Sequence, residues 1–307
     1  MNKPLLSICI PTYNREKQLE RLLKSITCQK WFTDEVEIVV SDWPSKDWTQ
    51  NMVKEYQEKY KNISYYRNDI NIWMTPALLE VVEYAKWEYS RMFGSDDQMN
   101  NLALESVLSV IKKEQPQLIL STLFHYNQDI EIENSIQKNE FNTFNGFQEL
   151  SSFMWSDKYN KATLWLEQHF TFMSVFCFNT NFFRESLAIC IKQKWKDYLL
   201  KNYFNYIYIV YSNLETGKIV LFKDNFILVK SSNNSDRNVK WKIYKDLDDL
   251  LTMIRWKYKL TPSFKKFIRR IRFFFVTLAI GAFVRKLWLT QNKYYIFLRN
   301  IVSKLRI

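Results

Sequence analysis

Apolar and polar positions follow a regular order at the start of the chain. The apolar run at residues 5–10, LLSICI, has strand character and ends at Pro11. The polar turn 12–15 follows, and apolar residues then recur at helical spacing, at Leu19, Leu22, Leu23 and Ile26. This order predicts a strand, a loop and a helix. In open α/β sheets, a loop at the carboxyl end of a strand lines the ligand crevice.

The same alternation continues along the first 120 residues. Segments of strand character lie near residues 36–40, 63–66, 88–93 and 117–121, with helical patterns between them. Because parallel strands need crossover connections, this order predicts an α/β fold with a mainly parallel, doubly wound sheet. Two polar segments follow strands directly: SDWPSKDWT after residues 36–40, and FGSDD after residues 88–93.

Five segments carry a family resemblance, and they stand in the family's order over roughly the first 120 residues: LSICIPTYNR, VEIVVSDWPSKDWT, NISYYRNDINIW, VVEYAKWEY and MFGSDD. The chain resembles the family 2 glycosyltransferases of GT-A fold, in particular the abequosyltransferase-like enzymes of O-antigen synthesis. The likeness is looser from Gly146 to Ser232, and we find none beyond that.

The resemblance implies a Rossmann-like, mostly parallel central sheet with flanking helices. We expect a GT-A domain over residues 1–232, with a nucleotide-sugar-binding half at 1–120 and an acceptor half at 121–232. A helical, basic C-terminal region is expected at 233–307.

Transfer of a sugar needs a seat for the donor nucleotide. By resemblance, Asp42 accepts hydrogen bonds from the nucleobase edge, while Pro11, Tyr13 and Arg15 surround the nucleotide. Arg15 is a candidate for a phosphate contact. The alternative for Asp42 is an Asx turn or a helix cap leading into Lys46 and Asp47. The alternative for Tyr13 is ordinary loop packing.

Two adjacent carboxylates close the third buried strand. Asp96 and Asp97 suit a hard divalent ion, Mg²⁺ or Mn²⁺, which takes diphosphate oxygens as its other ligands. By resemblance, Asp97 is the metal ligand and Asp96 contacts the metal or the ribose of the nucleotide-sugar. The family more often has a third acidic residue here or the pattern D-x-D, and Ser95 departs from it. The alternative is a solvated acidic turn.

The general base is the residue that the sequence identifies least well. An inverting mechanism needs a carboxylate near the acceptor hydroxyl, and in the family it comes from the second half of the chain. Glu167 lies at a suitable place in the sequence, with His169 two positions on. The alternative is that each is a structural or surface residue.

The net charge of +12 belongs to the end of the chain. Residues 255–307 hold 14 Lys and Arg and no acidic residue, whereas the rest is close to neutral. The apolar run 273–284 is too short to span a bilayer, which takes about 20 residues, so we predict an interfacial anchor on an anionic membrane surface. The alternative is a core-packing helical hairpin with a basic outer face.

Composition narrows the remaining classes. Four cysteines share no short spacing, so neither a disulfide framework nor a zinc site is indicated. The apolar run at the N-terminus is too short for a signal peptide. We therefore expect a cytoplasmic protein, peripheral on the inner face of the cell membrane. A nucleic-acid-binding module is disfavoured because the basic tail is not interleaved with base-stacking aromatic residues.

The expected activity is transfer of a sugar, with inversion, from a nucleotide-sugar to a hydroxyl of a lipid-linked or cell-surface saccharide. The alternative is a catalytically inactive, membrane-bound relic of the same fold that still binds saccharide or nucleotide. Nucleotide-sugar pyrophosphorylases have a related fold but carry a glycine-rich basic loop after the first strand, where this chain has PTYNR.

The tryptophan content is abnormal. The chain has eleven Trp and four Gly, although about twenty Gly are expected at ordinary usage. Four tryptophans stand where the family has glycine: Trp43, Trp48, Trp73 and Trp87. Glycine serves such loops through positive φ and close backbone approach to a ligand. We hypothesise that the gene comes from a lineage that reads UGA as glycine, and that the four positions carry Trp because the gene was translated with a code that reads UGA as Trp. The alternative is a truly divergent, AT-rich sequence.

Overall fold

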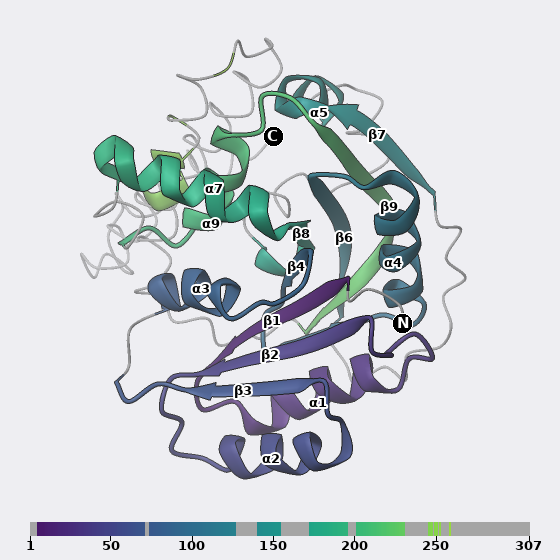
Figure 1. Cartoon of the computed structure of the whole chain (residues 1–307), viewed down its shortest axis with the longest axis vertical. Coiled ribbons are helices and arrows are strands. Elements are labelled where there is room, and N and C mark those ends of the chain that lie inside the picture. Colours follow the sequence, from purple (N-terminus) through teal and green to yellow (C-terminus); the bar gives the residue numbers. More distant parts are fainter. Residues whose placement is uncertain are drawn as a thin grey trace, which may run out of the picture.

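The computed structural model describes residues 5–70, 74–126, 140–154, 172–195 and 201–230, with parts of 245–258. Figure 1 shows these residues as one twisted sheet with helices on both faces. Within the described residues, the strands join in the order β3-β2-β1-β4-β8-β6-β9-β5, and β7 pairs with β9. The predicted α/β class is confirmed.

The first four strands are parallel, as predicted. They are β1 (Leu6–Thr12), β2 (Val36–Asp42), β3 (Ile63–Arg67) and β4 (Tyr89–Met92), with β1 between β2 and β4. Every residue of β1 and β2 is buried because helices cover both faces. In Figure 1, α1 (Glu16–Thr27) and α2 (Thr49–Lys59) lie on one side of these strands and α3 (Met74–Glu83) on the other.

The second half of the sheet is mixed. Strand β8 (Phe176–Asn179) is antiparallel to β4 and to β6 (Leu118–Tyr126), and β6 is parallel to β9 (Lys218–Lys230). The short strands β5 (Asp97–Met99) and β7 (Phe141–Asn145) are antiparallel to β9. The sequence analysis did not predict β5, β7, β8 or β9, whose partners lie far apart in the chain.

Helices close the second half. They are α4 (Ala103–Glu114), α5 (Gly146–Met154), α7 (Thr180–Cys190) and α9 (Asn205–Ser212), with a 3-10 turn η2 (Met173–Val175) and a π-helical turn η3 (Ile191–Trp195). Asn179 caps α7, since its side chain accepts the Phe182 N–H at 3.0 Å. Turn η2 leads directly into β8, which fixes its place beside the end of β4.

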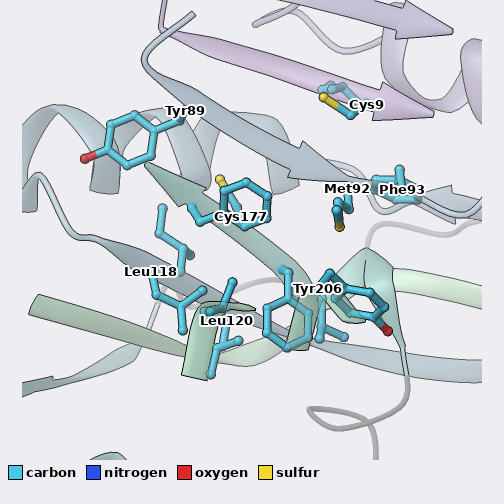
Figure 2. Close-up of a cluster of buried hydrophobic side chains, with 14 of the residues drawn as sticks. Cys9, Tyr89, Met92, Phe93, Leu118, Leu120, Cys177 and Tyr206 are labelled. Atoms are coloured by element: carbon cyan, nitrogen blue, oxygen red, sulfur yellow. The ribbon is translucent and has the colours of Figure 1, made fainter. Parts of the chain in front are cut away.

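A single hydrophobic core runs through both halves. Figure 2 shows part of it, where Cys9 and Met92 from the parallel strands belong to the same cluster as Cys177 of β8 and Leu118 of β6. The interior therefore has no break near residue 120. The division there into a nucleotide-sugar-binding half and an acceptor half stays a prediction. Burial raises the pKa of the Cys9 thiol, as expected of a small apolar core residue.

The described residues beyond position 232 pack on this same core. Leu250 is fully buried, and the Tyr258 hydroxyl donates to the Tyr211 carbonyl at 2.5 Å. The Tyr258 ring also packs on Phe147, with centroids 4.9 Å apart. No helix among the described residues is long and apolar enough to cross a membrane. The apolar run 273–284 and the rest of the basic tail after Tyr258 lie outside the described residues.

Candidate active site

Two loops at the carboxyl ends of β1 and β2, residues 11–15 and 42–49, are here called the donor loops. Because β1 and β2 are adjacent and parallel, their ends meet and the loops bond to each other. The Asn14 N–H donates to Ser45 Oγ at 2.8 Å, and Asn14 Oδ1 accepts the Lys46 N–H at 2.7 Å. Asn14 has φ 50°, a left-handed conformation that Asn tolerates.

Asp47 fastens the donor loops to two helices. Its Oδ2 accepts the Glu16 N–H in the first turn of α1 at 3.1 Å, and its Oδ1 accepts the N–H and the hydroxyl of Thr49 at the start of α2. A carboxylate at two helix N-termini interacts favourably with both dipoles. Burial alone would raise the pKa of Asp47, but these hydrogen bonds outweigh it and the pKa is lowered.

Asp42 is the last residue of β2 and the first of the second donor loop, and it is fully buried. Its Oδ1 accepts the Ser45 N–H at 3.2 Å and the Ser45 hydroxyl at 2.5 Å, and its Oδ2 accepts the Tyr65 hydroxyl at 2.5 Å. The Ser45 bonds form the local turn that the sequence offered as the alternative. Burial and the Asp42 carboxylate both raise the pKa of Tyr65. The nucleobase contact of Asp42 stays a prediction.

The other donor-loop candidates differ in exposure. Pro11 is buried within β1, in register with Ser41 of β2, whereas Tyr13 is half-buried in the loop that follows. Arg15, with 41% of its side chain exposed, forms an ion pair with Asp96, which is 55% exposed. Arg15 therefore joins the first donor loop to the acidic motif. Its predicted phosphate contact remains a prediction.

Residues 94–97, here called the carboxylate turn, link β4 to β5. The Asp97 N–H donates to the Gly94 carbonyl at 3.1 Å, which closes the turn. Asp97 then begins β5, in register with Val229 of β9, and only 7% of it is exposed. The alternative of a solvated acidic turn therefore does not fit Asp97, whereas Asp96 is exposed to solvent.

The two carboxylates converge over Gly94. A Cβ atom at position 94 would lie 3.0 Å from Asp97 Oδ2 and 3.3 Å from Asp96 Oδ1. Burial first, and then the neighbouring Asp96 charge, raise the pKa of Asp97 to about 7, against opposing effects of Ser174 and Arg15. Two crowded carboxylates at one point are a donor set that a divalent cation fits, because the cation relieves their repulsion.

The protein supplies only part of a coordination shell here. Within the described residues there is no group of three or more His, Cys, Asp or Glu side chains that could hold a metal ion. The predicted Mg²⁺ or Mn²⁺ would therefore take diphosphate oxygens and water besides Asp97 and Asp96, which suits an ion that arrives with its nucleotide.

Sequence reasoning missed two groups at this site. Tyr65 and Ser174 each hold one of the proposed carboxylates, Asp42 and Asp97 respectively. The other partner of Asp42, Ser45, could be expected from the sequence because it follows Asp42 at turn spacing. Ser174 is 77 positions from Asp97, and nothing in the sequence near either residue indicates their contact. Glu167, the proposed base, and His169 lie outside the described residues.

Three of the four unusual tryptophans can be placed. Trp48 is 67% exposed, Trp43 is 8% exposed and Trp87 is half-buried, while Trp73 lies outside the described residues. None of the three has positive φ, so the conformational reason for glycine is not met there. Yet the indole N–H groups of Trp43 and Trp87 are buried with no hydrogen-bond partner in the described structure. A buried indole N–H normally has one.

Solved structures agree with this fold. The glycosyltransferase TarS of Staphylococcus aureus, residues 1–349 in complex with UDP-GlcNAc, matches 86% of this chain and 70% of its own at a TM-score of 0.57 and 20% identity. The mannosyltransferase PcManGT of Pyrobaculum calidifontis, in complex with GDP-Man and Mn²⁺, matches 99% of this chain and 81% of its own at a TM-score of 0.57 and 14% identity.

Sequence comparison points the same way. The chain is 42% identical over 96 residues to the abequosyltransferase RfbV of Salmonella typhimurium, a match that covers 31% of this chain and only 29% of the length of that protein. The model of glycosyl transferase family 2 matches residues 7–187, which include both donor loops and the carboxylate turn. The chain therefore belongs to glycosyl transferase family 2.

Proposed function

We propose that this protein is a metal-dependent, inverting glycosyltransferase that moves a sugar from a nucleotide-sugar to a hydroxyl of a lipid-linked or cell-surface saccharide. One observation carries the proposal: the carboxylate turn converges over Gly94 and is tied by Arg15 to the donor loops. In this arrangement an arginine, which can bind phosphate oxygens, lies beside two carboxylates, which can bind Mg²⁺ or Mn²⁺. A metal-bound diphosphate needs both kinds of group.

The donor loops form the nucleoside end of the proposed site. Asp42 is held rigidly by Ser45 and Tyr65, so its remaining acceptor capacity has one fixed direction. A fixed, buried acceptor suits recognition of an N–H at a nucleobase edge, because a ligand without that donor would leave it unpaired. Tyr13, half-buried in the same loops, is the candidate for contact with the base or ribose.

The carboxylate turn forms the diphosphate end. Asp97, with Asp96, would hold the divalent ion, which when bound supplies Lewis-acid stabilisation of the departing nucleoside diphosphate. Arg15 is half-exposed and shares Asp96 with that site. Its guanidinium can therefore contact phosphate oxygens without breaking any buried bond, and it balances the charge of Asp96 in the free protein.

Glu167 is proposed as the base that takes the proton of the acceptor hydroxyl, on its place in the sequence alone. Attack on the face opposite the leaving nucleotide gives inversion. The donor test measures release of nucleoside diphosphate from a panel of UDP-, GDP-, CDP- and dTDP-sugars with Mn²⁺. Donor-specific release that stops in excess EDTA is expected. Full activity in the chelator would refute the metal role.

A second outcome would favour the inactive relic. Nucleotide binding, measured by calorimetry, without any release from the whole panel would indicate a binding protein of this fold. The burial of Trp43 in the second donor loop is the observation that keeps this candidate open.

The membrane proposal has its own test. Residues 261–307 carry eleven of the tail's fourteen basic residues, each worth about 1 kcal/mol at an anionic surface. A chain ending at Leu260 keeps Leu250 and Tyr258, which belong to the core. We expect full-length protein to co-sediment with phosphatidylglycerol vesicles in a salt-sensitive way and the shortened chain to remain in solution. Equal sedimentation of the two would refute the anchor.

A further inference from the structure

Ser174 connects the second half of the chain to the carboxylate turn. It lies in η2, immediately before β8, and is fully buried. Its hydroxyl donates to Asp97 Oδ2 and accepts the Gly94 N–H at 2.8 Å. One side chain thus bonds to both ends of the turn that carries the proposed metal ligands.

A hydroxyl in this position fixes the rotation of the carboxylate. With Oδ2 bound to Ser174, the Asp97 side chain has only Oδ1 free of that bond, and the Gly94 bond keeps the backbone of the turn at a fixed distance from the same hydroxyl. The hydrogen-bonded partner of a ligand carboxylate orients it, and loss of such partners typically weakens metal binding by about 10–100-fold.

Ser174 is itself held from behind by a buried guanidinium. Arg91 of β4 is fully buried, and its Nη2 donates to the Ser174 carbonyl at 3.2 Å and to the Ser121 hydroxyl at 3.1 Å. Its Nε and Nη1 have no hydrogen-bond partner in the described structure. The centroid of the Phe93 ring lies 5.7 Å from the guanidinium carbon. Two hydrogen bonds and one ring offset little of the cost of burying a guanidinium, so its bond to the Ser174 carbonyl is the contact that bears on the site.

We propose that Ser174 is a positioning residue for the metal ligand Asp97, and that Arg91 secures Ser174 by binding its carbonyl oxygen. This inference rests on the proposed function, since it assigns Ser174 a role only if Asp97 binds the divalent ion. It makes the donor site a product of both halves of the chain: the carboxylate turn after β4 supplies Asp96 and Asp97, and η2 sets the direction of the Asp97 side chain.

The test measures Mn²⁺ affinity directly, by the electron paramagnetic resonance signal of free Mn²⁺ in titrations of the full-length protein, first alone and then with UDP, GDP, CDP or dTDP at a fixed concentration. Ser174→Ala is expected to weaken binding about tenfold or more. Ser174→Thr keeps a hydroxyl and should restore most of the affinity. The control is Ser90→Ala, also a fully buried serine, whose hydroxyl pairs with Thr180 and touches neither carboxylate; it should change affinity less than about twofold.

Thermal unfolding in EDTA separates folding from positioning. If Ser174→Ala does not fold, Ser174→Cys replaces it, because the thiol is larger than the hydroxyl but fills the site, and it is only a weak donor. A folded Ser174 variant with unchanged Mn²⁺ affinity, beside an Asp97→Asn variant that has lost binding, overturns the inference and leaves the proposed function standing. Unchanged affinity in Asp97→Asn overturns both.

Discussion

The donor loops and the carboxylate turn are built in opposite ways. In the donor loops, polar side chains bond to one another and to nearby helix ends, so Asp42, Ser45 and Asp47 are part of the scaffold. In the carboxylate turn, Asp96 is half-exposed and Asp97 is held by a residue from the far half of the chain. The first region fastens itself locally, whereas the second depends on distant strands.

This difference separates stability from chemistry. Removing a polar group from the donor loops leaves its partners unpaired and weakens the fold as well as the site. Removing a carboxylate from the carboxylate turn relieves repulsion between two crowded negative charges, so the fold should tolerate it while the chemistry does not. Such a conflict between stability and activity is common at functional sites.

The largest expected effect is that of Asp97→Asn. Loss of a metal ligand removes several kcal/mol of Lewis-acid stabilisation, so we expect the rate of donor turnover to fall by about 10²–10³-fold. The melting temperature of the metal-free protein should stay the same or rise, because a buried negative charge beside Asp96 is removed. Turnover assays and thermal unfolding in EDTA measure the two quantities.

Asp96→Asn is the matched comparison within the same turn. Its side chain is 55% exposed and paired with Arg15, so a smaller loss of turnover, about tenfold, is expected from weakened metal contact. Equal losses in the two variants would mean that burial and the Ser174 bond give Asp97 no special role. A large fall in melting temperature for Asp97→Asn would contradict the contrast between the two regions.

The contrast also explains what the sequence could predict. Strands β1 to β4 and their loops could be predicted because each is a local pattern: an apolar run, a polar turn and a helical repeat. Asp96 and Asp97 of the carboxylate turn could also be predicted, because they closely follow a predicted strand. The pairing of β5 with β9, more than 120 residues away, had no local signal. The bond from Ser174 to Asp97 depends on that pairing and on β8, so no reading of nearby residues could find it.

The next largest effect is expected from the four tryptophans at the family's glycine positions, through nucleotide binding at the donor loops. Glycines that the fold needs are present: Gly146 has φ 75° and Gly217 φ 111°, where a side chain would collide with its neighbours. Trp43 and Trp87 have ordinary φ but unpaired buried indoles, so an effect on ligand binding is the prediction that remains. Changing Trp43, Trp48, Trp73 and Trp87 to Gly should tighten nucleotide binding about tenfold, the loss of roughly 1.4 kcal/mol of crowding.

Peptide mass spectrometry of protein from the native organism provides the decisive control. Glycine masses at the four positions would support the hypothesis, and tryptophan masses would refute it. The control variant is Trp31→Gly. Trp31 precedes β2 in the sequence, packs against the core and is not one of the family's glycine positions. It should not tighten nucleotide binding.

Tyr65→Phe probes how firmly Asp42 is held. The change removes the hydroxyl that donates to Asp42 Oδ2 and leaves the ring in place, so we expect a loss of about 1 kcal/mol in the free energy of unfolding. The KM for the donor should rise about threefold to tenfold because Asp42 loses its fixed direction. Urea unfolding and donor titration measure these effects. An unchanged KM with lowered stability would make Asp42 purely structural.

The smallest expected effect belongs to Asp47→Asn. Asp47 is exposed, but its carboxylate accepts N–H groups at the starts of both α1 and α2. An exposed charge at a helix N-terminus contributes about 0.5 kcal/mol, which corresponds to roughly 1–2 °C in melting temperature for a domain of this size.

The pH dependence of that difference follows from the lowered pKa of Asp47. A carboxylate whose pKa is lower in the folded state than in the unfolded chain stabilises the fold above its ordinary value of 3.8, and loses this contribution as the pH falls further. The gap between wild type and Asp47→Asn should therefore be constant at neutral pH and close as the pH falls below the ordinary carboxyl value of 3.8. Asp34→Asn is the control, because Asp34 is exposed and caps neither helix. The two variants are compared at neutral pH. If both lower the melting temperature equally, the loss reflects net charge. The hydrogen bonds from Asp47 to the starts of α1 and α2 would then not stabilise the donor loops.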